Sequence, residues 1–194
     1  MDPIKSLIVR IGALEAELEA ELAKRRAALN VGLERGKVAF EEEVLRRHSE
    51  FRTKLSRYIV QAHPLVVLTA PVIYSLIVPL LLLDLFVTLY HAICFPVYGI
   101  AKVRRTDYFA FDRRHLAYLN VLEKINCAYC SYANGLIAYV REVAGRTEQY
   151  WCPIKHARRV IGAHAQYPTF YDYGDAGAFR GRPNEGPAKE PSSD

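Results

Sequence analysis

The chain has 194 residues and a formal net charge of +5, from 26 Lys and Arg against 21 Asp and Glu. Hydrophobic residues make up 51% of it, gathered in the central third, and the basic residues cluster beside that apolar region. Anionic lipid headgroups account for basic residues placed there, so nucleic acid is not expected as a partner. The sequence predicts an all-α membrane protein, and we expect no removable signal peptide at its N-terminus.

The first predicted domain, residues 1–62, is a long amphipathic helix. Asp2 and Pro3 suit the N-cap and the first helical position. Apolar residues with the 3–4 spacing of a coiled-coil seam follow at Ile4, Leu7, Ile11, Leu14 and Leu18. Gly32 and Gly36 each cost about 1 kcal/mol in a helix interior and indicate a bend or break. We expect the seam to pack on a second copy or another membrane protein, or to lie on the membrane surface.

Residues 63–101 form the predicted membrane segment. Residues 65–101 contain no Lys or Arg. The length of this stretch is well beyond the roughly 20 apolar residues that a transmembrane helix needs. A straight helix through the whole stretch would be about 55 Å long, against a hydrocarbon core of about 30 Å. The stretch is therefore either a single span or a helical hairpin bent near Pro79. Basic residues on both flanks favour the hairpin, with both termini in the cytoplasm.

Two ionisable residues interrupt this stretch, Asp84 and His91. Seven residues apart, they share one helix face. Ionisable groups at membrane depth indicate a polar contact between helices or subunits, or a proton or metal relay, although His91 also suits the headgroup level. Beyond them an aromatic band beside Lys102, Arg104 and Arg105 predicts the membrane–water interface.

Residues 102–165 are predicted to be a small helical domain. A helix begins near Asp112, with apolar residues at 3–4 spacing. Asn134 and Gly135 suit a helix end, which would let residues 136–144 turn back as a second helix. Pro153 suits the start of a short basic helix that continues to residue 165. Residues 166–194 lack periodicity and are predicted to be a disordered tail.

Cysteine and histidine spacing indicates a metal site. Cys127 and Cys130 form a C-x2-C pair, and after 21 further residues Cys152 and His156 form a C-x3-H pair. Two such pairs can supply the Cys3His ligands of a structural zinc site. An iron–sulfur cluster is the alternative, and the closing spacing is similar to that of membrane-anchored CDGSH-type proteins. Ordinary packed cysteines and a redox C-x-x-C pair are the remaining alternatives.

No catalytic residue set emerges from these patterns. The leading functional prediction is a non-enzymatic scaffold or adaptor at the cytoplasmic face of a membrane, with zinc holding the C-terminal helices together. The alternative is a membrane-associated redox protein that uses an iron–sulfur centre or reactive thiols.

Overall fold

The computed structural model describes residues 3–28, 31–34, 37–40 and 42–182. These residues are mostly helical, and the chain divides into two compact units. Unit 1 comprises Met1–Gln61 and Asp112–Cys127, and unit 2 comprises Ala62–Phe111 and Ala128–Asp194.

Unit 1 begins with a helix that is much shorter than predicted. Its elements up to residue 61 are α1 (Pro3–Ala28), β1 (Val31–Glu34), β2 (Lys37–Phe40), α2 (Glu42–Glu50) and α3 (Leu55–Gln61). The two strands pair antiparallel, with Gly32 opposite Ala39. The prediction of one helix over residues 1–62 is therefore wrong after Ala28, although the described residues are mostly helical, as the predicted all-α class requires. Glycine disfavours a helix interior, and the alternation of apolar residues from Val31 fits a strand. Asp2 and Gly36 lie outside the described residues.

The rest of unit 1 leads into α6 (Val121–Trp151) through the short turn η2 (Asp112–His115). Asn120 caps α6 reciprocally with Glu123: the Asn120 side chain accepts from the Glu123 N–H at 3.0 Å, and the Glu123 carboxylate accepts from the Asn120 N–H at 2.8 Å. This capping box satisfies two helix-terminal donors. It explains why the helix predicted from Asp112 begins only at Val121.

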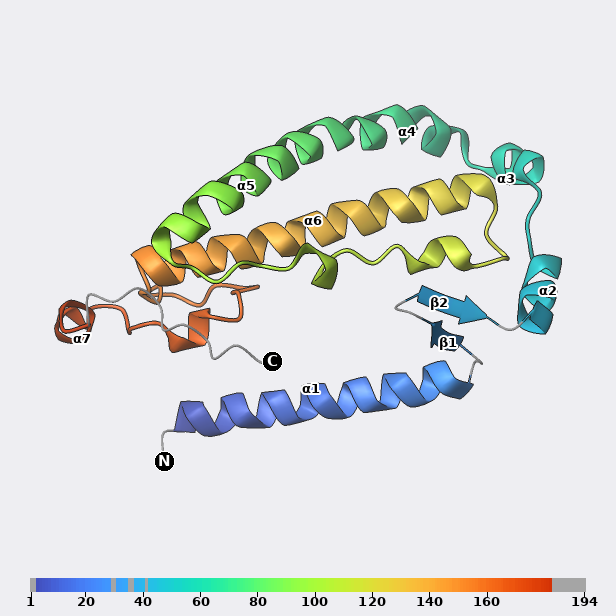
Figure 1. The fold of residues 1–194 in the computed structure, drawn as a ribbon. Coiled ribbons are helices and arrows are strands. Elements are labelled where there is room, and N and C mark those ends of the chain that lie inside the picture. The colour runs from blue at the N-terminus through green and yellow to red at the C-terminus, as the bar shows by residue number, and fades with distance from the viewer. Residues whose placement is uncertain (1–2, 29–30, 35–36, 41, 183–194) are drawn as a thin grey trace. The chain divides into compact units, whose positions relative to one another are not determined.

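Unit 2 is built on two consecutive helices, α4 (Pro64–Ser75) and α5 (Ile77–Tyr98), which are separated only at Leu76. Figure 1 shows them as one continuous arc. Among the described residues, Pro64–Tyr98 is the helical stretch whose length and composition would allow it to cross a membrane. The predicted hairpin at Pro79 does not form. Pro79 falls in the first turn of α5, where a missing backbone N–H breaks no helical hydrogen bond.

After α5 the chain turns back along it. Gly99 ends the helix with φ = 67°, a conformation that glycine adopts without strain. The returning stretch, residues 100–111, includes the short turn η1 (Arg105–Asp107). The Val103 N–H donates to His91 Nε2 at 2.9 Å, and Arg105 pairs with Asp84. The stretch therefore runs antiparallel to α5, and we call it the return segment.

Helix α6 then runs beside α5 in the same direction (Figure 1). Tyr132 in its first half bonds to Asp84, and Tyr150 near its end stacks on Tyr98 at 5.4 Å between ring centroids. The core of unit 2 forms where α5, the return segment and α6 meet, and consists of Phe95, Ile100, Val103, Leu136, Tyr139 and Val143.

The helix end predicted at Asn134 and Gly135 is absent, because Gly135 lies inside the continuous helix α6, as does Gly145. A Cβ on Gly135 would lie 2.7 Å from the backbone oxygen of Tyr108, and one on Gly145 would lie 2.7 Å from the ring of His164. These glycines allow the return segment and the C-terminal segment to approach the helix closely. They serve packing and do not end the helix.

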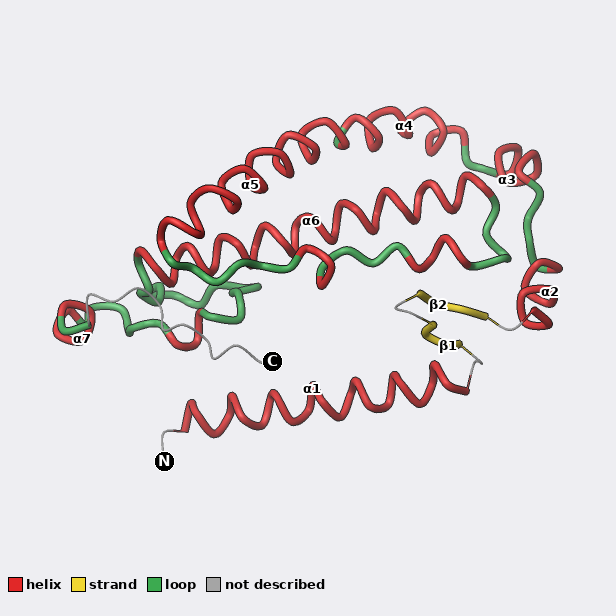
Figure 2. The backbone as a smooth tube through the Cα atoms, viewed as in Figure 1, coloured by secondary structure: helices red, strands yellow, loops and turns green. Residues whose placement is uncertain are grey.

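The C-terminal segment, residues 152–182, has little regular structure, as the mostly green tube after α6 in Figure 2 shows. Ile154 pairs with Tyr171, and η3 (Tyr167–Thr169) and α7 (Ala176–Arg180) follow. The basic helix predicted for residues 153–165 is not formed. The predicted disordered tail is wrong for residues 166–182, where Phe170 is 4% exposed. Residues 183–194 lie outside the described part of the chain.

Candidate functional site

The outward face of α4 and α5 is apolar along its whole length. It exposes large side chains, with Leu68 72% exposed, Phe86 65% and Val97 75%. The other large hydrophobic residues on this face include Leu65, Val72, Leu76, Leu81, Leu85, Leu89 and Ile93. Soluble monomers rarely expose continuous apolar surface of this extent, so such a face marks an interaction site. We call it the apolar face.

The opposite side of the same helices carries the polar groups of α5. Its residues face α6 and the return segment at 3–4 spacing, and they include Tyr74, Asp84, Val87, His91 and Phe95. This stripe explains how one helix can be apolar towards its surroundings and still hold two ionisable side chains.

Asp84 is neutralised by Arg105 of the return segment. Both carboxylate oxygens contact the guanidinium, and the Nη2–Oδ2 distance is 2.7 Å. The Asp84 side chain is 16% exposed and that of Arg105 is 41% exposed. A two-point contact of this kind fixes orientation as well as charge. The hydrogen bond to Asp84 is the main reason why the pKa of Arg105 is raised.

Two hydroxyl groups complete the coordination of the carboxylate. The Tyr132 hydroxyl donates to Asp84 Oδ2 at 2.9 Å, and the Thr88 hydroxyl donates to Oδ1 at 3.1 Å. Burial, reinforced by the bond to Asp84, raises the pKa of Tyr132 to about 12. The Arg105 guanidinium also lies 4.5 Å from the centre of the Phe109 ring, within cation–π range. The cluster is therefore balanced in charge and fully hydrogen-bonded at its carboxylate.

His91 has a structural contact in this fold. Its side chain is buried, its Nε2 accepts from the Val103 N–H, and its ring lies 4.5 Å from that of Phe95. Accepting this bond leaves Nε2 without a proton. His91 thereby accepts a hydrogen bond from a backbone N–H of the return segment. This N–H has no helix or strand partner, because the return segment is irregular at Val103.

The three basic residues predicted at the interface have different environments. Lys102 is exposed, and Arg104 is 81% exposed with an ion pair to Asp107 at 3.2 Å. Arg105 instead turns inward to Asp84. Sequence reasoning missed this pairing, although a lone carboxylate in an apolar stretch signals that a cation must lie nearby.

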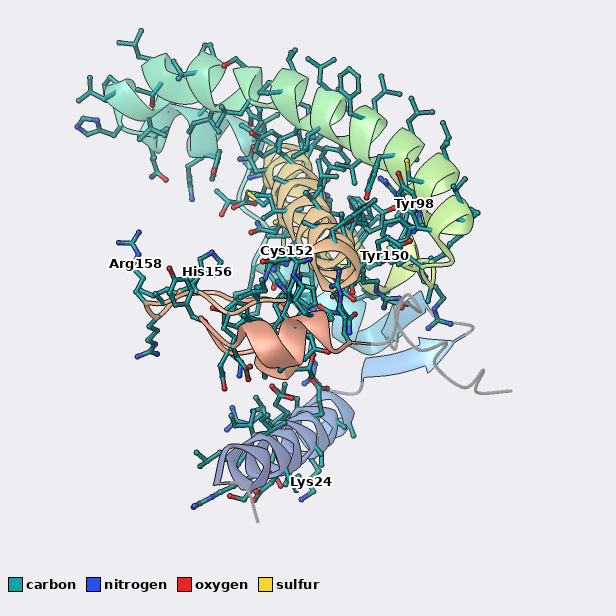
Figure 3. The ribbon with its side chains drawn as sticks, turned by 90° about the vertical axis from the view of Figure 1, so that its left-hand side faces the viewer. Lys24, Tyr98, Tyr150, Cys152, His156 and Arg158 are labelled. Atoms are coloured by element: carbon teal, nitrogen blue, oxygen red, sulfur yellow. The ribbon has the colours of Figure 1, made fainter. Side chains whose placement is uncertain are left out.

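Aromatic side chains gather where α5 and α6 end together. Tyr98 stacks on Tyr150 and meets the Trp151 ring edge-on at 5.4 Å. Figure 3 shows Tyr98 and Tyr150 at this end of the two helices. Tyrosine and tryptophan favour the boundary between apolar and aqueous surroundings, because their rings are apolar and their tips are polar.

The four predicted metal ligands are not brought together. Cys127 and Cys130 lie in α6, whereas Cys152 follows its last residue, so 22 helical steps place Cys130 and Cys152 about 33 Å apart. His156 lies further along the C-terminal segment (Figure 3) and contacts the Tyr167 hydroxyl at 3.3 Å. Within the described residues, no group of three or more His, Cys, Asp or Glu side chains could hold a metal ion. The prediction that these side chains converge is wrong, because α6 continues past the two glycines.

Comparison with known proteins gives no relative from which function could be carried over. No family model matches the chain, and no curated protein or solved structure matches it significantly. The apolar face and the ion pair beneath it are therefore the features that indicate function.

Proposed function

We propose that this protein is a membrane-anchored scaffold or adaptor, held to a lipid bilayer by the apolar face of α4 and α5. The observation that carries the proposal is the continuous exposure of large apolar side chains from Leu65 to Val97, without a Lys or Arg among them. Lipid tails are the surroundings that such a surface suits best.

The energetics favour a stable anchor. Burying one exposed Leu or Phe side chain contributes about 1.5–3 kcal/mol. Five such residues, each with half of its surface transferred into lipid, contribute about 4–8 kcal/mol, and the face offers more than five. The only carboxylate of α5, Asp84, lies on the opposite side and is bonded to Arg105 and two hydroxyl groups, so it is not transferred into lipid with the apolar face.

Unit 1 offers a surface for the scaffolding role. Helix α1 exposes apolar side chains at seam spacing, with Leu7 57%, Ile11 56% and Leu14 58% exposed. An apolar seam of this kind is stable when it packs on another helix. A second copy of the chain, or a helix of a membrane protein, is the proposed partner of α1.

A zinc or iron–sulfur site built from Cys127, Cys130, Cys152 and His156 would require a break in α6. The anchoring role is independent of that site.

Flotation with phospholipid vesicles tests the anchor. The variant Phe86→Glu/Leu89→Glu places two carboxylates one turn apart on the apolar face, and we expect it to lose most of its vesicle binding. The matched control, Ala157→Glu/Ala165→Glu, adds the same charge at two exposed positions of the C-terminal segment and should float like the unchanged protein. Unchanged flotation of the first variant would refute the proposal.

A further inference from the structure

The length of the apolar face sets a first constraint on how it meets a bilayer. Pro64–Tyr98 has 35 residues and would be about 52 Å long, against a hydrocarbon core of about 30 Å. To cross the core along its whole length, the helix would need a tilt of about 55°, beyond the usual range of about 0–40°. If α5 alone crossed, α4 would project into water with Leu65, Val66 and Leu68 exposed.

The return segment gives the second constraint. Val103 bonds to His91, seven residues before the end of α5, and Arg105 bonds to Asp84, fourteen residues before that end. Arg104 therefore lies alongside α5, about 10–21 Å from Tyr98. If α5 crossed the bilayer with Tyr98 at its boundary, Arg104 would lie near the centre of the hydrocarbon.

Arg104 is unsuited to that depth, because its side chain is 81% exposed and its partner Asp107 is 48% exposed. An arginine at the bilayer centre costs at least about 2.5–3.5 kcal/mol. The backbone of residues 100–104 is also irregular, and non-helical backbone is not tolerated where it would face lipid.

Charge on the elements that cover α5 gives the third constraint. Arg146 pairs with Glu142 at 2.7 Å, and Glu148 contacts His164 of the C-terminal segment at 2.9 Å. These groups belong to α6 and to the segments packed beside it. The apolar face is on the other side of α4 and α5, so unit 2 has one lipid-compatible side and one hydrated side.

From these constraints we infer that α4 and α5 lie along the surface of the bilayer and do not cross it. The apolar face is immersed in the outer part of one leaflet, while α6, the return segment and the C-terminal segment stay on the aqueous side. Both ends of the chain then lie on the same side of the membrane. The basic residues on both flanks of the apolar stretch agree with this arrangement. The inference rests on the proposed membrane anchor and specifies its geometry.

Depth measurements with spin labels test the inference. Single cysteines replace Leu68, Phe86 and Val97 in a chain whose four native cysteines are changed to serine, and the proteins are bound to phosphatidylcholine–phosphatidylglycerol vesicles. We expect all three labels at similar depths of about 5–10 Å, as for an interfacial helix. A crossing helix would instead place the label at residue 86 about 15 Å deep, with the other two near the surfaces. That profile would overturn the inference and leave the anchor intact.

Two further measurements keep the outcomes distinct. A label at Ala157 should remain in water, and immersion of no label on the apolar face would reject the anchor itself. Epitope tags at the two ends of the otherwise unchanged chain give a test that needs no cysteine replacement. In sealed vesicles both tags should react equally with an external antibody, and reaction of one tag alone would contradict the surface arrangement.

Discussion

Removing the guanidinium of Arg105 should destabilise unit 2 strongly, because it leaves Asp84 charged and mostly buried. Loss of one partner of a buried ion pair costs about 3–5 kcal/mol. Arg105 is 41% exposed, so water can replace part of the contact. We therefore expect Arg105→Met to cost about 2–3 kcal/mol, or about 4–12 °C in melting temperature for a chain of this size.

The matched control is the neighbouring Arg104→Met. Its ion pair with Asp107 lies in solvent, and exposed pairs contribute about 0–1 kcal/mol. Thermal unfolding in detergent micelles, followed by circular dichroism, measures both variants. The double variant Asp84→Leu/Arg105→Met removes the buried charge and should recover most of the lost stability. If the double variant lost as much stability as the sum of the losses caused by Asp84→Leu and Arg105→Met alone, the view that the two residues act as a unit would be refuted.

Three further predictions concern packing, ionisation and association. Gly135→Ala should lower the melting temperature, because its Cβ would meet the Tyr108 backbone oxygen at 2.7 Å, whereas Gly12→Ala, with open space around it, should raise helix stability by up to about 1 kcal/mol. The pKa of Tyr132 is raised from 10.0 to about 12, so its stabilising contribution is complete below pH 10 and is lost as the pH rises through about 12. Tyr132→Phe should therefore show a smaller fall in melting temperature between pH 9 and pH 11.5 than the unchanged protein, and an identical fall would contradict this assignment. The proposed packing of α1 on a second copy predicts that Leu14→Asp lowers the mass of the detergent-solubilised protein measured by light scattering, and an unchanged mass would rule out self-association through α1.

The apolar stretch of α4 and α5 could be predicted from sequence, because an uninterrupted run of large hydrophobic residues needs no tertiary information. Its path could not. Equal basic flanks favour a hairpin, but Pro79 occupies the first turn of α5, where its missing N–H removes no hydrogen bond within that helix.

The partners of the polar residues also lay beyond sequence reasoning. The sequence marks Asp84 as an unusual group in an apolar stretch, but it predicts that Arg105 lies at the membrane interface. The two residues meet because the chain reverses at Gly99 and the hydrogen bond from the Val103 N–H to His91 aligns the return segment with α5. These are long-range contacts that no local pattern encodes.

The prediction for the cysteines depended on where α6 ended. Gly135 and Gly145 are common helix-ending residues, so a break between the two ligand pairs was reasonable on propensity alone. Close approach of Tyr108 and His164 to these positions explains why glycine occurs inside a helix instead. Tertiary packing at these two glycines therefore explains why α6 continues, and the local sequence alone does not contain that information.

The most direct test of the anchor is to place a fluorescent probe on the apolar face. In the variant Phe86→Trp/Trp151→Phe the probe becomes the only tryptophan of the chain. On addition of vesicles that contain brominated phosphatidylcholine, its emission should shift to shorter wavelength and be strongly quenched. Emission that keeps the wavelength of a water-exposed indole and is not quenched by the brominated lipid would show that α4 and α5 do not bind the bilayer through this face.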